Sequence, residues 1–155
     1  ATWNQMRAAA RAEKTPLVKD QLYFLLSTSE DEALARRALD LALRDEPGAT
    51  NSAAMIAGVA QLHPDLAFDF AMSNLAAVND KVDAPSRSRY FPMLGSRSAD
   101  AAMIDKINAY ANTKLTVDSR RTAATAVANV TDRIRVRRER LPAIDAWLVS
   151  RKASP

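Results

Sequence analysis

Cysteine is absent from this chain of 155 residues, which also contains only one histidine and three glycines. Without cysteine the chain can form no disulfide, no thiolate nucleophile and no cysteine-based metal site. The lone histidine, His63, excludes a His-Glu-x-x-His zinc motif, and three glycines are too few for a glycine-rich phosphate loop. The sequence therefore offers no catalytic residues or metal ligands of its own, and we expect no cofactor in this chain.

Long apolar runs are also missing. No run approaches the roughly 18 residues that a membrane span needs, so we expect no membrane partner. No charged segment followed by an apolar one marks a signal peptide at the start. A first residue of Ala rather than Met fits a fragment of a longer protein or a processed chain. The compartment stays open, because a chain without cysteine is stable in either redox environment.

Helix-forming patterns fill the chain. Apolar residues make up 48% of the sequence and alanine, the best helix former, is abundant. Helix-start signals recur, each with a polar residue that can cap a helix or a proline suited to a first turn. They lie at Thr15-Pro16, Ser29-Glu30, Thr50-Asn51, His63-Pro64, Asp83 to Ser86, Ser98 to Asp100 and Asp118-Ser119. Because no alternation of β-branched residues indicates a strand, the sequence predicts an all-α protein of about eight helices.

Local details of these helices can also be predicted. Ser29 is expected to cap the third helix, and Leu141-Pro142 to interrupt the last long one. Apolar residues at helical spacing identify Ile56, Phe70 and Trp147 as core anchors on three separate helices.

Alternate helices begin near residues 16, 51, 85 and 118, at spacings of 35, 34 and 33 residues. This period is typical of stacked helix pairs, although no sequence motif repeats with it. We therefore expect residues 1–155 to form a single domain, a right-handed, HEAT-like stack of antiparallel helix pairs. Such stacks have a concave face on which partners usually bind.

Positive charge is concentrated near the end of the chain. Residues 118–155 hold nine basic and four acidic groups, whereas the rest is close to neutral. The densest part is Arg133 to Arg140, which can bind phosphate, capture a peptide carboxylate, or simply form a solvated helix end that complements the helix dipole. No aromatic residues interleave these arginines and the rest of the chain has no basic excess, so we do not expect a nucleic-acid partner.

Few other residues are candidates for chemistry. His63 precedes a proline at a helix start, where a histidine is usually a cap or a surface residue. Asp65 and Asp69 lie four residues apart and could form a carboxylate pair, but a first-turn acid and a solvated face are the favoured interpretation. No arrangement of Ser, His and Asp indicates a catalytic triad.

The segment from His63 to Leu75 carries a more specific pattern. Phe68, Asp69 and Phe70 are followed by Asn74, which resembles the "(L)AW-x-F-(x)3-N-W" signature of the puromycin-sensitive and endoplasmic-reticulum type of zinc aminopeptidase. Phe68 and Leu75 replace the family's two tryptophans. Further resemblance lies at Ser88 to Phe91 and in the closing "LP…WL" segment, Leu141 to Leu148, so that it runs from about residue 34 to 148.

The resemblance implies a non-catalytic, HEAT-like C-terminal domain that closes over the catalytic domain of the same polypeptide and contacts the distal part of a peptide substrate. In that family the zinc and its ligands belong to an earlier domain, so this chain alone should be inactive. The alternatives are a free-standing helical-repeat module that binds a protein segment and, third, a basic domain that binds nucleic acid.

Three polar residues at helix starts are candidates for peptide contact. Asn51 opens a helix whose backbone N–H groups favour an anion, and Arg87 and Arg89 flank the matching turn one repeat later. An arginine there could pair with a peptide carboxylate in bidentate fashion. The alternative is that all three are caps or surface groups.

Overall fold

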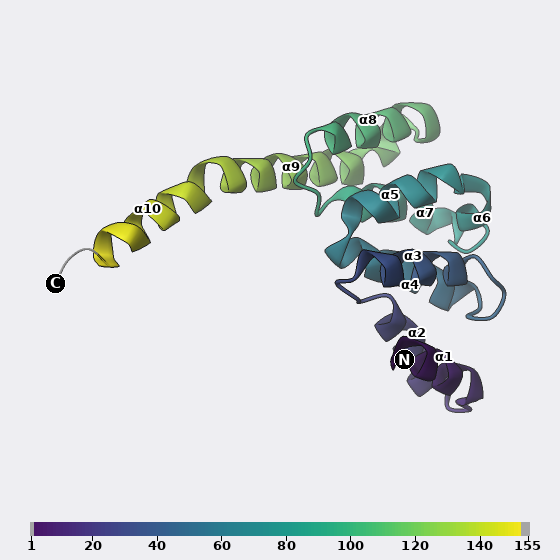
Figure 1. The fold of residues 1–155 in the computed structure, drawn as a ribbon. Coiled ribbons are helices and arrows are strands. Elements are labelled where there is room, and N and C mark those ends of the chain that lie inside the picture. Colours follow the sequence, from purple (N-terminus) through teal and green to yellow (C-terminus); the bar gives the residue numbers. More distant parts are fainter. Residues whose placement is uncertain (1, 153–155) are drawn as a thin grey trace.

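The computed structural model describes residues 2–152 and is built from α-helices, with no strand among these residues (Figure 1). The all-α prediction is therefore confirmed. The helices are α1 (Thr2–Ala12), α2 (Pro16–Leu26), α3 (Glu32–Ala42), α4 (Ala49–Leu62), α5 (Pro64–Ser73), α6 (Leu75–Asn79), α7 (Arg87–Gly95), α8 (Ala102–Lys114), α9 (Arg121–Arg135) and α10 (Leu141–Lys152). Since α5 and α6 are separated by one residue and α9 continues into α10, they form about eight rods, as predicted.

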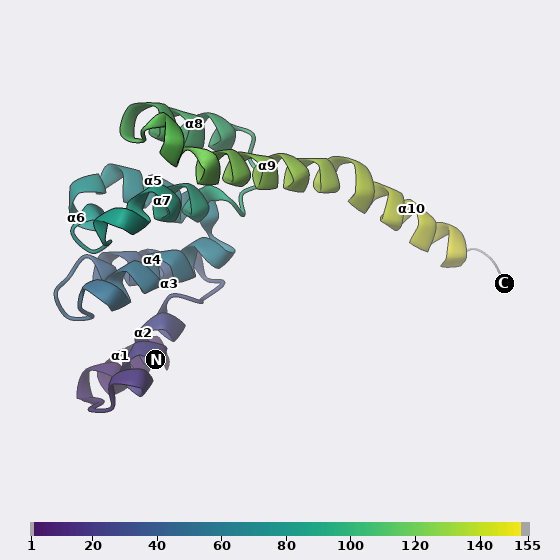
Figure 2. The same ribbon diagram turned by 180° about the vertical axis from the view of Figure 1, so that it is seen from behind.

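The rods stack in layers. α1 packs on α2, α3 on α4, α5 on α7, and α8 on α9, and the layers follow one another along the stack (Figures 1 and 2). α4 contacts α2 in the layer before it and α5 and α7 in the layer after it. Each layer therefore buries its apolar faces against its neighbours rather than around one central point.

Hydrogen bonds join successive layers, at separations close to the repeat length. The Ser29 carbonyl oxygen lies 2.9 Å from Nε2 of His63, 34 residues later. The hydroxyl of Tyr90 donates to the Ala53 carbonyl, 37 residues earlier, at 2.8 Å. Burial raises the pKa of the Tyr90 hydroxyl, which keeps it a proton donor. The separations of these two contacts, 34 and 37 residues, are close to the period of 33 to 35 residues in the sequence.

The core lies between the layers. Ile56 is fully buried in it, which confirms its prediction as a core anchor. The prediction for α5 was wrong by about one residue in phase. Phe68 is buried on this helix, whereas Phe70 is only partly buried against the core. α5 packs on both α4 and α7. The buried face of α5 consists of Ala67, Phe68 and Ala71.

The end of the chain differs most from expectation. Trp147 was predicted as a core anchor but is 54% exposed, because α10 projects away from the stack (Figure 2). Leu141-Pro142 does not interrupt the helix either. A turn of π-helix, Val136–Arg140, precedes the proline, and the Leu141 N–H bonds to the Val136 carbonyl. This wider turn changes the hydrogen-bond register before Pro142, where an α-helical proline would clash with a carbonyl.

The start of α3 also differs in detail. Its N-cap is Asp31, whose carboxylate accepts hydrogen bonds from the N–H groups of Ala33 and Leu34. Ser29 was predicted as this cap, but its hydroxyl instead accepts from the Asp31 N–H at 3.2 Å. A carboxylate is the stronger acceptor at the positive end of a helix.

Candidate functional site

His63 has a structural position. It lies at the turn between α4 and α5, partly buried, with Nε2 against the Ser29 carbonyl. No group of three or more His, Asp or Glu side chains that could hold a metal ion occurs within residues 2–152. The one histidine of the chain therefore ties two layers together rather than forming part of a metal cluster in the described structure.

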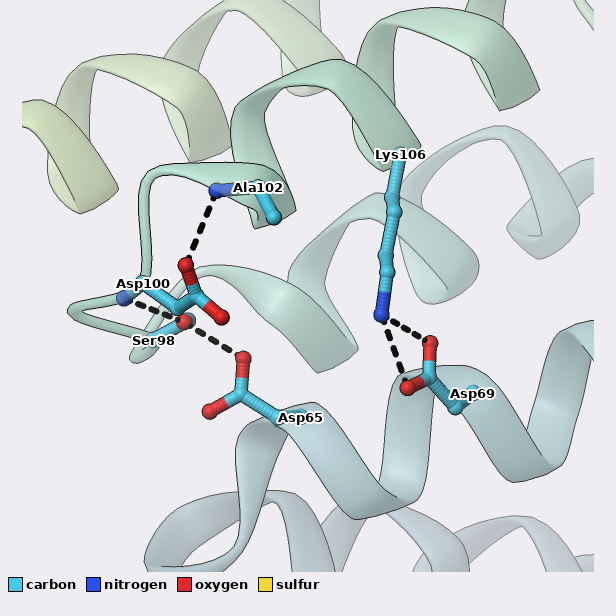
Figure 3. Close-up of polar contacts among 6 residues, drawn as sticks. All are labelled: Asp65, Asp69, Ser98, Asp100, Ala102 and Lys106. Atoms are coloured by element: carbon cyan, nitrogen blue, oxygen red, sulfur yellow. Dashed lines mark hydrogen bonds and ion pairs between the residues drawn. The ribbon is translucent and has the colours of Figure 1, made fainter.

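Asp65 and Asp69 do not act as a carboxylate pair. Both lie on α5, but each binds a different residue near or on α8 (Figure 3). The buried Ser98 hydroxyl donates to Asp65 at 2.6 Å, and the same hydroxyl oxygen accepts from the Asp100 N–H at 3.0 Å. Lys106 binds both carboxylate oxygens of Asp69, at 2.6 and 2.8 Å. Each of the two carboxylates thus bonds α5 to the neighbouring layer.

Asn51 lies in the first turn of α4, which begins two residues before it, after Gly48. Gly48 has a φ of +82°, a backbone conformation that favours glycine. The Asn51 amide donates to Asp20 Oδ1 at 2.8 Å and to the Pro47 carbonyl at 3.0 Å. The side chain therefore joins α4 to α2 and closes the turn before α4.

Arg87 begins α7 and points back towards the preceding helix. Its guanidinium donates to the Val82 carbonyl at 3.0 Å and to the Asn79 carbonyl at 2.8 Å. Asn79 is the last residue of α6, and its carbonyl also accepts from the Val82 N–H at 3.2 Å. Arg87 therefore adds a charged donor at a helix end, where a cation is favoured.

Arg89 is exposed and forms no hydrogen bond or ion pair with the rest of the described chain. The hydrogen bond from Tyr90 to Ala53 brings the first turns of α7 and α4 into contact. The three predicted residues consequently lie at the same edge of the stack. They do not converge on one pocket, because Arg87 lines a cavity of about 340 Å³ that neither Asn51 nor Arg89 lines.

The cavity beside Arg87 contains two groups that sequence reasoning missed. One is Lys114, at the end of α8, which is exposed and has no ion-pair partner among the described residues. The other is Tyr110. Burial raises the pKa of the Tyr110 hydroxyl, and the nearby Arg87 charge partly offsets this rise. The sequence signal for Lys114 was a basic residue in a last helical turn, which is explained equally well by the helix dipole.

Comparison with known families decides what kind of chain this is. A family model described as "ERAP1-like C-terminal domain" matches residues 1–132. The chain belongs to the ERAP1-like C-terminal domain family. This membership indicates a domain of an aminopeptidase, in agreement with the resemblance in the sequence. The matched residues of this ERAP1-like C-terminal domain include Asn51, Arg87 and Arg89, whereas α10 lies beyond them.

The other comparisons add no relative. No curated protein and no solved structure matches this ERAP1-like C-terminal domain. Within the described residues, none of the helices is both long enough and apolar enough to span a membrane.

Proposed function

We propose that this domain forms the end of a larger zinc aminopeptidase, where it closes the catalytic chamber and contacts the distal part of the peptide substrate. The observation that carries the proposal is the family match over residues 1–132. In this proposal the zinc belongs to a catalytic domain outside this chain, as membership of the family implies. The chain's own contribution is therefore to shape and charge a surface, and no chemical step passes through its residues.

Arg89 is the strongest candidate for contact with a peptide. It lies at the start of α7 and is both exposed and unpaired among the described residues. A free guanidinium can bind a carboxylate of the peptide in bidentate fashion. Arg87 and Asn51 hold neighbouring turns in place through their bonds to Asn79 and Asp20, so in this proposal they position the edge on which Arg89 stands.

Lengthening the substrate tests this proposal. The full-length enzyme would be assayed with single-residue amide substrates and with peptides of increasing length, as wild type and as Arg89→Ala. We expect a higher KM for the long peptides and unchanged kinetics for the amides, because a remote contact adds binding without touching the zinc chemistry. Arg11→Ala, which removes an exposed arginine from α1, is the matched control. Equal effects of Arg89→Ala on short and long substrates, or none on either, would remove this edge from the peptide path.

A further inference from the structure

The exposed arm α10 has an apolar stripe that nothing in the described structure covers. Leu141, Ile144, Trp147 and Leu148 lie on one side of this helix and are 47%, 51%, 54% and 45% exposed. Arg151 stacks on the Trp147 ring, with its guanidinium carbon 4.8 Å from the ring centre. An apolar stripe of this length on a soluble helix marks an interaction surface.

A groove of about 1020 Å³ lies at the base of this arm, in the angle between α9 and the stack. Its walls come from the turn between α4 and α5, the loop between α7 and α8, and the last turns of α9. Leu62 and Met93 give it two exposed apolar side chains. Leu141 lines the groove and also begins the stripe of α10, so that the groove and the arm form one continuous surface.

Three guanidinium groups of this groove have no carboxylate partner in the described structure. They belong to Arg97, Arg133 and Arg137, and none of these guanidinium groups forms a hydrogen bond or ion pair with another described residue. Of its acidic residues, Asp132 is paired with Arg135, whereas Asp65 and Asp100 accept hydrogen bonds from the uncharged Ser98 hydroxyl and Ala102 N–H. The surface therefore combines apolar contact area with three free guanidinium groups.

These features select among partners. A flat anionic membrane could reach α10, but its headgroups could not follow the surface into the angle where Arg97 and Arg133 lie. A second copy is disfavoured by charge, because antiparallel α10 helices would bring Arg138 and Arg140 of one copy towards Arg151 of the other. A slender acidic segment with one apolar face satisfies both the groove and the stripe.

We propose that the groove and α10 bind an acidic amphipathic helix of a partner protein. Its apolar face packs on Leu62, Met93 and the α10 stripe, and its carboxylates pair with the guanidinium groups of Arg97, Arg133 and Arg137. The 12 residues of α10 span about 18 Å, enough for three turns of a docked helix. This surface lies at the other ends of α4 and α7 from Asn51 and Arg89, so the inference does not depend on the proposed function.

The test uses the 155-residue chain and a synthetic amphipathic peptide with leucines on one face and glutamates on the other. Matched peptides carry glutamine or lysine in place of glutamate. Binding is measured through Trp147 fluorescence, since Trp3 is nearly buried. We expect saturable binding of the glutamate peptide alone, weakened by salt, with a blue shift that Trp147→Phe removes. Arg133→Glu/Arg137→Glu should weaken binding at least about tenfold, which corresponds to about 1.4 kcal/mol.

Arg121→Glu is the matched control, because it reverses an exposed charge at the other end of α9 and should leave binding unchanged. Leu148→Ser should weaken binding while leaving the melting temperature unchanged, since Leu148 lies outside the core. Equal binding of the three peptides would overturn the proposal. So would binding to phosphatidylglycerol vesicles without binding of the peptide, or a sedimenting dimer that Leu148→Ser dissociates while no peptide binds.

Discussion

Arg120 makes, just before α9, the same pair of contacts that Arg87 makes at the start of α7. Each guanidinium donates to the carbonyl five residues earlier and to the carbonyl eight residues earlier. For Arg87 these carbonyls belong to Val82 and Asn79, and for Arg120 to Leu115 and Asn112. The chain has no repeated sequence motif, but its layers share this way of holding a helix end to the next helix start.

The lengths of these bonds predict unequal effects on stability. The Arg87 bonds are 3.0 and 2.8 Å long, whereas those of Arg120 are 3.4 to 3.5 Å. Charged hydrogen bonds contribute about 1.5–3 kcal/mol when well formed. Arg87→Ala should therefore lower the free energy of unfolding by about 1–2 kcal/mol and Arg120→Ala by less, as measured by urea denaturation. Arg89→Ala is the neutral control. A larger loss of unfolding free energy for Arg120→Ala than for Arg87→Ala would contradict this ranking by bond length.

At Gly58 of α4, we expect a substitution by alanine to lower stability. A methyl group there would overlap the Ser27 hydroxyl and lie 3.2 Å from Phe24 Cε2, because α4 passes close to the end of α2. The overpacking cost of about 1–3 kcal/mol should exceed the helix-propensity gain of about 1 kcal/mol. Gly58→Ala should thus lower the melting temperature, and adding Ser27→Ala should restore most of it. A stabilised single variant would contradict the close approach.

The two aromatic residues of α5 should differ in their contribution to the core. Phe68 is 1% exposed, so Phe68→Ala should cost about 3–5 kcal/mol. Phe70→Ala should cost less, because the ring is already partly in contact with water. Chemical denaturation of the two variants gives the order directly, and the reverse order would mean that the helix is rotated from the orientation described.

The ion pair of Glu46 with Arg7 should make the stability of the fold depend on pH. Two hydrogen bonds from Arg7 hold the pKa of Glu46 below its ordinary value of 4.5. A lowered pKa in the folded state adds stability above the unfolded pKa, and this stability is lost as the pH falls through the folded pKa. Because both side chains are partly exposed, we expect at most about 1 kcal/mol. Glu46→Gln should flatten the stability profile below about pH 4.5.

The isolated chain should neither bind zinc stoichiometrically nor hydrolyse aminoacyl reporter amides. The reason is its ligand set, since three or four His, Cys or carboxylate ligands hold zinc in enzymes and this chain has a single His and no Cys. Elemental analysis and an amide assay of the purified chain test this expectation. One zinc per chain, or an activity that persists through repeated purification, would contradict it.

Much of the fold could be predicted because its signals are local. Thr15-Pro16, Asp31 and Asp83 mark helix starts within a few residues, and the spacing of these starts predicts the layers. Features set by tertiary contact could not be predicted in this way. An apolar helix such as α10 has the same pattern whether or not anything covers it, which is why Trp147 was placed in the core.

The candidate site shows the same division. The position of Arg87 at a helix start is visible in the sequence, but the direction of its guanidinium depends on where the preceding loop carries the Asn79 and Val82 carbonyls. Similarly, Asp65 and Asp69 share a face of one helix, yet their partners Ser98 and Lys106 become evident only when α5 and α8 are seen together.

The ties between layers have a consequence for how the chain folds and yields to force. The bonds His63–Ser29, Asp65–Ser98 and Asp69–Lys106 join residues only 33 to 37 positions apart. Closing such short loops costs little chain entropy, so folding can begin in one layer and spread to its neighbours quickly. A force that pulls on the two ends would load these hydrogen bonds one after another. The stack would then unfold sequentially, layer by layer, rather than in a single step.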